Sequence, residues 1–202
     1  MKIFSISDAI SFGFKTVKRN FFFFLGVVAI VFAVSAVNSS LQESLIDQWF
    51  LYTLVSIVFW IIAEVVGMGV IRINLSFVDG KKPKFSDLFI LNWRQLLNYI
   101  LSSFLVGLTV LGGMILLIVP GIIFALKLQY TTYLIVDKNI GPIEAYKKSW
   151  KMTKGQVWHL FLLALTFIGI NLAGLLLLVI GLLFSAPLSM VAATSVYRKL
   201  SS

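Results

Sequence analysis

The sequence contains no cysteine, only one histidine and few charged residues. Without cysteine the chain can form no disulfide, has no thiol nucleophile and offers no thiolate ligand for zinc. Charged residues make up 12% of the 202 residues, whereas they account for about a quarter of a typical soluble domain. Hydrophobic residues make up 59%, and the mean hydropathy is +0.99. This composition excludes an ordinary soluble globular domain and indicates a polytopic membrane protein.

Groups that could carry out catalysis are equally scarce. The chain has eight acidic residues, and its one histidine is His159. We find no carboxylate pair, no metal-ligand spacing, no nucleophile motif and no phosphate-binding glycine loop. We therefore expect no catalytic residue, no cofactor and no metal ion. A distant alternative is an enzyme acting on lipid headgroups, with Asp87, Glu144 and His159 in one pocket.

The apolar runs predict the number of membrane spans. At about 20 residues per span, the chain has room for about six spans and no separate soluble domain. The predicted spans cover about 21–37, 51–77, 99–119 and 122–136, a fifth that begins with 158–171, and a sixth that ends at 197–199. The first run could instead be a signal peptide, since 34–36 resembles a cleavage site. We favour a span, because a long amphipathic segment precedes it and more spans follow.

The basic residues indicate the orientation of these spans. The chain has 17 Lys and Arg residues and a net charge of +9. If the N-terminus is cytosolic, the predicted outer loops at about 38–50, 119–121 and 174–186 contain none of them. Cytosolic segments of membrane proteins carry an excess of Lys and Arg. We therefore predict that both termini are cytosolic, and we expect no nucleic-acid partner.

Three basic, aromatic segments, at about 5–19, 86–96 and 142–157, each precede a pair of spans. They predict three tandem units over about 5–77, 86–136 and 142–199 within a single membrane domain, 1–202. Each unit is a short amphipathic interfacial helix followed by a transmembrane hairpin. All units enter the membrane from the same side, so they are parallel repeats. The predicted fold is an all-α bundle of six spans in three hairpins.

The third amphipathic segment has the clearest signals. Pro142 suits the first position of a helix, and Glu144 faces the positive end of its dipole. Helical spacing predicts an apolar stripe of Ile143, Tyr146, Trp150 and Val157. The candidates for contact with anionic lipid headgroups on the cytosolic face are Lys147, Lys148, Lys151, Lys154 and Trp150. The alternative is a solvated helix packed on its own bundle.

Several short motifs of the second half recur in a known group of membrane proteins: Val119-Pro120-Gly121, Gly141-Pro142, Ser149-Trp150, Ala186-Pro187 and Tyr197-Arg198. Over 119–199 the chain resembles the membrane domain of bacterial glycerophosphoryl diester phosphodiesterases and related uncharacterised six-helix integral membrane families. The resemblance implies a stand-alone, multi-pass domain in the cytoplasmic membrane of a prokaryote. In the phosphodiesterases the chemistry belongs to a separate soluble barrel, to which nothing in this chain corresponds.

Three charged residues fall inside predicted spans: Glu64 and Arg72 in the second and Lys127 in the fourth. A charge near the middle of a span costs roughly 2.5 to 3.5 kcal/mol, so Glu64 is expected to find a partner inside the protein. Arg72 lies about 12 Å further along the helix and can reach the cytosol. Lys127, at a similar depth, is the better partner for Glu64. The pair could form an ion-responsive site or a purely structural ion pair.

Two functions remain open. The leading hypothesis is a non-enzymatic transport or permeation module around Glu64 and Lys127, acting as a homo-oligomer. The alternative is a membrane-embedded scaffold, stress or regulatory protein that binds lipid or a partner membrane protein. A water-filled path past the charged pair would favour the first hypothesis. A dry bundle with lipid-facing grooves would favour the second.

Overall fold

The computed structural model describes residues 4–177 and 181–201, and all regular structure within them is helical. The elements in chain order are α1 (Ile6–Arg19), α2 (Phe21–Ser44), α3 (Trp49–Val78), the 3-10 helix η1 (Phe85–Phe89), α4 (Trp93–Leu116), α5 (Ile118–Leu128), α6 (Thr131–Lys138), α7 (Pro142–Met152), α8 (Val157–Leu176) and α9 (Leu182–Ser201). The prediction of an all-α fold is confirmed for this part of the chain.

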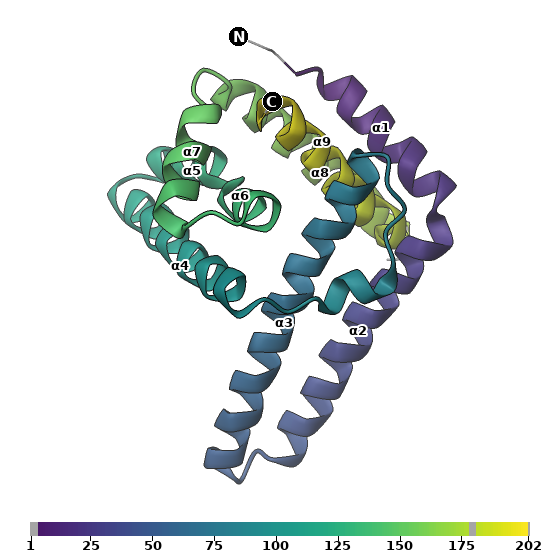
Figure 1. Ribbon diagram of the computed structural model, residues 1–202, viewed down its shortest axis with the longest axis vertical. Coiled ribbons are helices and arrows are strands. Elements are labelled where there is room, and N and C mark those ends of the chain that lie inside the picture. Colours follow the sequence, from purple (N-terminus) through teal and green to yellow (C-terminus); the bar gives the residue numbers. More distant parts are fainter. Residues whose placement is uncertain (1–3, 178–180, 202) are drawn as a thin grey trace.

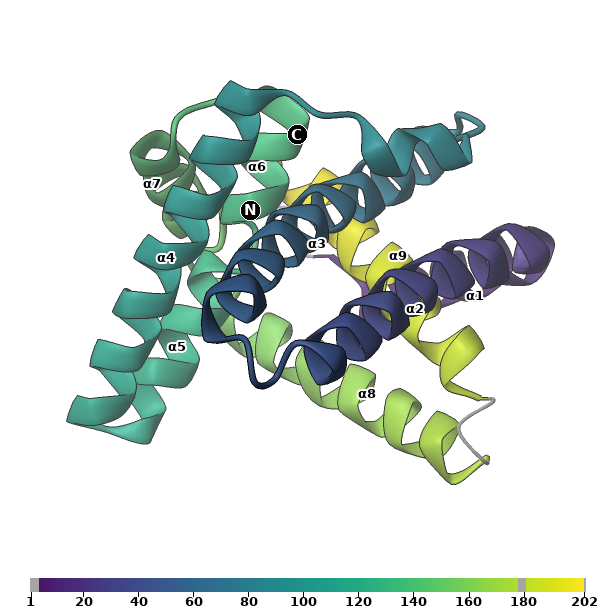
Figure 2. The ribbon, with the colours of Figure 1, turned by 90° about the horizontal axis from the view of Figure 1, so that it is seen from below.

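The long helices pair into hairpins that spread away from a common base. Helices α2 and α3 form the longest hairpin, and its tip extends far from the rest of the molecule (Figure 1). Helices α4 and α5 form a second hairpin, and α8 and α9 a third. Seen from below, the three hairpins point in different directions (Figure 2). Helix α1 and the last turn of α9 lie at the base, opposite the α2–α3 tip (Figure 1).

Within the described residues, five helical stretches are long and apolar enough to cross a membrane: α2, α3, α4, the stretch Ile118–Lys138 that contains α5 and α6, and α8. Helix α9, the expected sixth span, is not among them. Half of its 20 residues are buried, and many of these are Ser, Thr or Ala. A helix that packs mainly against protein does not need the apolar surface of a lipid-facing one. The apolar helices support a membrane protein, whereas the count of six spans remains a prediction.

The protein core lies at the base rather than along the hairpins. Tyr130 and Tyr197 are fully buried there, with ring centroids 5.8 Å apart. By contrast, only 11% of the most apolar part of α2 is buried, compared with 39% for the α5–α6 stretch. The outer parts of the hairpins therefore present apolar side chains that only lipid or another protein can cover.

Span four begins differently from the prediction. The turn expected at Pro120-Gly121 lies instead at Leu117, whose backbone is extended (φ −163°, ψ 147°). Pro120 falls within the first turn of α5, where its missing N–H is not needed. A Cβ added to Gly113 would lie 3.0 Å from the Gly121 Cα. The two glycines therefore allow the tight packing of α4 against α5.

The same span is also interrupted near its other end. The expected continuous helix over 122–136 is broken at Gln129-Tyr130, between α5 and α6. At 11 residues, α5 is about 16 Å long, too short to cross a membrane by itself. The prediction of one uninterrupted helix was wrong. No proline or glycine marks the break, so the sequence pattern could not show it.

The second amphipathic segment, 86–96, is not one helix. It consists of η1, an extended stretch through Asn92, and the first turn of α4. Asn92 caps α4, because its side-chain oxygen accepts from the Gln95 N–H at 3.1 Å. Helix η1 packs closely on α3, where a Cβ added to Gly69 would lie 2.7 Å from the Leu88 carbonyl carbon. The first predicted amphipathic segment does form a helix, α1. The third forms α7 only as far as Met152, and its last residue, Val157, begins α8.

The connection between α8 and α9 is shorter than expected. The predicted outer loop covered 174–186, but α8 continues to Leu176 and α9 begins at Leu182. Part of the predicted boundary between the fifth and sixth spans, residues 178–180, lies outside the described residues. A Cβ added to Gly181 would lie 2.7 Å from the Gly174 Cα, so the two helix ends approach closely.

Candidate functional site

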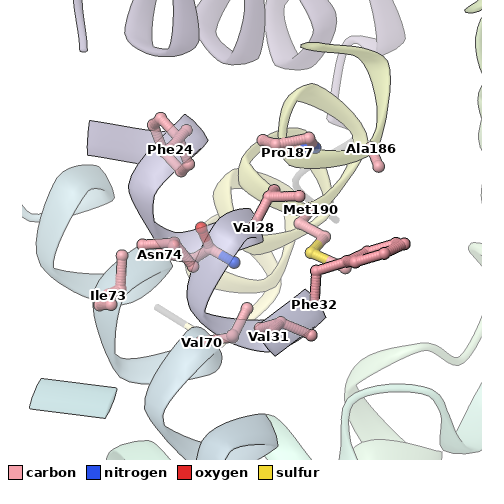
Figure 3. Close-up of a pocket in the computed structure, with 11 residues that line it drawn as sticks. Phe24, Val28, Val31, Phe32, Val70, Ile73, Asn74, Ala186, Pro187 and Met190 are labelled. Atoms are coloured by element: carbon pink, nitrogen blue, oxygen red, sulfur yellow. The ribbon is translucent and has the colours of Figure 1, made fainter. Parts of the chain in front are cut away.

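An apolar groove lies between α2, α3 and α9, and we call it the α2–α9 groove (Figure 3). Its volume is about 200 Å³. Its lining residues are Phe24, Val27, Val28, Val31, Phe32, Val70, Ile73, Asn74, Ala186, Pro187 and Met190. All of them except Asn74 are apolar. The groove therefore suits a hydrocarbon chain much better than a polar metabolite.

The groove is closed near the base and open further along α2. Phe24, in the first turn of α2, is 3% exposed. Phe32, two turns later, is 75% exposed. Val31, one residue earlier, is also exposed. The open side therefore faces the surroundings of the hairpins, which are lipid if α2 crosses the membrane.

Asn74 is the polar exception in this lining. The residue is only 3% exposed, and Figure 3 shows its amide directed toward the middle of the labelled side chains. Within residues 4–177 and 181–201, this amide makes no hydrogen bond. Among the described residues, the completely buried side-chain polar atoms without a partner are the Tyr130 hydroxyl and Gln156 Oε1, so the Asn74 amide remains accessible from the groove. The sequence analysis missed Asn74, although an amide inside the second predicted span, 51–77, was a visible signal.

The structure does not join Glu64 to Lys127. The ion pairs of the described residues include no contact between the two. Instead, Lys127 Nζ lies 3.5 Å from the centroid of the Trp150 ring, at the end of α5 and against α7. A cation over an indole face is stabilised by the negative charge of the ring face. Glu64 is half-buried on α3, and a functional role for it remains a prediction.

Helix α7 and the residue after it stabilise the interruption between α5 and α6. Ser149 Oγ and Thr153 Oγ1 donate hydrogen bonds to the Lys127 carbonyl oxygen at 2.8 and 3.2 Å. A carbonyl at a helix end has no partner within its own helix, so these hydroxyls stabilise the interruption. The contact requires small residues on the buried face of α7, and Ala145 is also fully buried there. The predicted apolar stripe was therefore wrong for Ile143, which is 63% exposed.

Most of the predicted lipid-headgroup candidates lie on α7, whereas Lys154 lies in the turn that follows it. The four exposed lysines are Lys147, Lys148, Lys151 and Lys154. Trp150 is half-buried, with Lys127 over its ring. Glu144 lies in the first turn of the helix, as expected, and Pro142 begins it. The charged face is thus free to contact headgroups, and that contact remains a prediction.

A charged cluster connects three helix ends at the base. Arg198 Nη2 and Nε donate to the two carboxylate oxygens of Asp79 at 2.6 and 2.8 Å, and Nη1 donates to Asp137 at 2.7 Å. The Tyr197 hydroxyl donates to the same Asp137 oxygen at 2.7 Å. We call Asp79, Asp137 and Arg198 the Arg198 cluster.

The members of the Arg198 cluster come from corresponding places in the three predicted units. Asp79 follows α3, Asp137 is near the end of α6, and Arg198 is near the end of α9. Each residue lies at or just after the end of the second membrane-spanning stretch of its unit, which is α3, α5–α6 or α9. The sequence analysis noted Arg198 only as part of the Tyr197-Arg198 motif and did not join the three residues, because a sequence gives no distance between segments so far apart in the chain.

A second hollow, of about 300 Å³, opens beside the Arg198 cluster. Its charged lining residues are Arg72, Asp79, Asp87, Asp137 and Arg198. Arg72 is held by the Ile90 carbonyl and the Gln95 side chain at 2.8 and 2.6 Å. Asp87 lines this hollow, but His159 lies elsewhere, edge-on to Phe4. Nor do the described residues contain a group of three or more His, Asp or Glu side chains placed to hold a metal ion.

Comparison with known proteins shows a resemblance within proteins of unknown function. A family described as "Protein of unknown function (DUF975)" matches residues 111–202. An uncharacterized protein of Mycobacterium bovis is 30% identical over 134 residues, and one of Mycobacterium tuberculosis is 29% identical over the same length. Each alignment covers 66% of this chain, and the chain spans 40% of the length of these relatives. No solved structure matches the chain.

These comparisons confirm a coarse form of the predicted resemblance. The family match includes the stretch 119–199, in which the motifs were found. It extends over α5 to α9, and therefore over Lys127, the α7 lysines and one wall of the groove. None of the matching names refers to a phosphodiesterase. That finer part of the resemblance remains a prediction.

Proposed function

We propose that this chain is a non-enzymatic integral membrane protein that holds a membrane lipid in the α2–α9 groove. The observation that carries the proposal is the groove itself, whose lining is apolar apart from one amide. A groove that opens beside exposed apolar helices is reached directly from the lipid phase. This function corresponds to the lipid-binding alternative of the sequence analysis rather than to transport.

The arrangement in the membrane belongs to the same proposal. Both termini lie on the cytosolic side of a prokaryotic cytoplasmic membrane, and α9 forms a sixth span. Its 20 residues give a length of about 30 Å, which matches the hydrocarbon thickness of a bilayer. The Arg198 cluster supports three repeated units, because it joins corresponding ends of their hairpins. The chain then resembles the membrane domain of the phosphodiesterases.

Basic residues near the base support contact with anionic headgroups. Helix α1 ends with Lys18 and Arg19, immediately before α2 and the closed end of the groove. Helix α7, with the exposed Lys147, Lys148 and Lys151, packs against α5, whose end is cytosolic in the proposed orientation. Basic segments next to a membrane attract anionic lipids by about 1 kcal/mol per residue. Lipid in the groove would therefore have its headgroup at a positively charged surface.

Lipid retention by two matched variants tests the proposal. Val28 lines the groove, and Val58 is an exposed residue of α3 outside it. Val28→Trp should fill the groove, whereas Val58→Trp should only change a lipid-facing surface. Native mass spectrometry after detergent exchange should find bound lipid on wild type and Val58→Trp and little on Val28→Trp. Equal retention by all three proteins would show that the groove is not the lipid site.

A transport module is the second candidate, favoured by the break at Gln129-Tyr130. Interrupted helices with exposed backbone groups form the substrate sites of many transporters. Lys127 lies beside this break. In proteoliposomes, a flux of protons or small ions that Glu64→Gln or Lys127→Met abolishes would establish this function. Absence of flux in wild type would reject it for the species tested.

A further inference from the structure

We propose that the Asn74 amide donates a hydrogen bond to the ester carbonyl of a diacyl lipid whose acyl chain occupies the α2–α9 groove. The groove then distinguishes ester-linked lipids from ether-linked ones. This inference rests on the proposed function and adds the chemical feature that is recognised. It begins from a buried amide that has no partner among the described residues and is directed into an apolar groove.

The position of Asn74 along α3 corresponds to the level of the ester groups. Helix α3 has 30 residues and a length of about 45 Å, close to the full thickness of a bilayer with its headgroup regions. The hydrocarbon core is about 30 Å thick, which leaves roughly 5–8 Å of interface on each side. Asn74 lies four residues before Val78, the last residue of α3, or about 6 Å from that end. The amide therefore lies where interface and hydrocarbon meet.

The groove leads away from this level toward the middle of the membrane. It follows α2 from the closed end at Phe24 to the open end at Phe32, a distance of about 12 Å for eight residues. Its volume of about 200 Å³ exceeds that of an apolar cavity of about 150 Å³ that holds benzene. Part of an acyl chain fits inside, and the remainder would leave the groove past Phe32.

The chemistry of the amide favours an ester over an ether. Asparagine offers two N–H donors and one carbonyl acceptor. An ester carbonyl is a good acceptor at the lipid backbone, and an ether linkage has no carbonyl at that place. Lys18 and Arg19 precede α2, so a phosphate attached to the same lipid would face positive charge. A partner helix with a free carbonyl is the competing occupant, and the experiment must distinguish it.

A competition between two lipids tests this inference. Purified protein is mixed with equal amounts of a diester phosphatidylglycerol and its diether analogue with identical chain lengths, and bound lipids are counted by native mass spectrometry. Wild type should prefer the diester by roughly threefold to tenfold, the range expected for one hydrogen bond. Asn74→Leu should bring the ratio close to one. Asn98→Leu is the matched control, because Asn98 donates to the Ile140 carbonyl outside the groove, and it should keep the wild-type preference.

The outcomes separate the two proposals. If wild type shows no preference, or if Asn74→Leu keeps it, the role of Asn74 is overturned. Lipid binding in the groove still stands in that case, provided that Val28→Trp displaces both lipids. If Val28→Trp displaces neither lipid, the proposed function and this inference both fail. A dimer that wild type forms and Asn74→Leu loses, without any ester preference, would assign the amide to a second copy and overturn the lipid proposal.

Discussion

Replacing Arg198 should weaken the base of the molecule more than replacing any exposed basic residue. Its guanidinium makes three hydrogen bonds to carboxylates on two other elements. Arg198→Met removes these bonds and keeps an unbranched apolar side chain. Asp79 and Asp137 then keep their negative charges without their shared cation, although Tyr197 still donates to Asp137.

The stability that Arg198→Met is expected to lose lies between the values for an exposed and a buried ion pair. An exposed ion pair contributes about 0–1 kcal/mol, and removing one partner of a buried pair costs about 3–5 kcal/mol. The side chains of Arg198 and Asp137 are 29% and 13% exposed, so the cluster is partly screened by solvent. We expect a loss of about 2–3 kcal/mol in the free energy of unfolding. For a chain of this length that corresponds to a fall in Tm of roughly 5–10 °C.

A thermal-shift assay in detergent measures this effect. Arg94→Met is the control, because Arg94 is exposed at the start of α4 and belongs to none of the ion pairs in the described residues. The control should melt within about 1 °C of wild type. In a double-mutant cycle, Asp79→Asn should cost much less in the Arg198→Met background than in wild type. If Arg198→Met melts like the control, the cluster does not hold the three helix ends together.

Two further predictions concern packing and the helix break. Gly69→Ala should lower stability by about 1–2 kcal/mol in the same assay, because its Cβ would meet the Leu88 backbone. Gly107→Ala is the control. Gly107 has open space around it, so this change should be neutral or slightly stabilising. A stable Gly69→Ala would refute the close packing of η1 on α3. Ser149→Ala should cost about 1 kcal/mol and speed amide hydrogen exchange around Gln129-Tyr130. Unchanged exchange there would show that α7 does not hold the break.

The membrane helices were the most predictable part of the fold. Their apolar runs are long enough that length and composition alone define them, and the helices appear where the runs were found. The ends were less predictable. The first run was expected to end at 37, but α2 continues through polar residues to Ser44. Polar residues can remain helical in water, so a change in polarity marks the edge of the hydrocarbon region and not the end of the helix.

The candidate site was much less predictable. Pairing Glu64 with Lys127 assumed two continuous helices at matched depth, and the break after Lys127 places its side chain over Trp150 instead. The Arg198 cluster depends on how three hairpins meet, which no local pattern contains. Asn74 could have been noticed as an amide inside a predicted span. Its lack of a partner becomes visible only when α2 and α9 are placed around it.

The most direct test of lipid binding in the α2–α9 groove is photo-crosslinking with a phospholipid that carries a diazirine in its acyl chain. The protein would be incubated with this lipid in a bilayer and then washed with detergent to remove loosely held lipid. It would next be irradiated to form the crosslinks and digested for peptide mapping. We predict that adducts concentrate on the groove segments, around 24–32 of α2 and 186–190 of α9. Adducts spread equally over the exposed faces of α4 and α8 would contradict a lipid site in the groove.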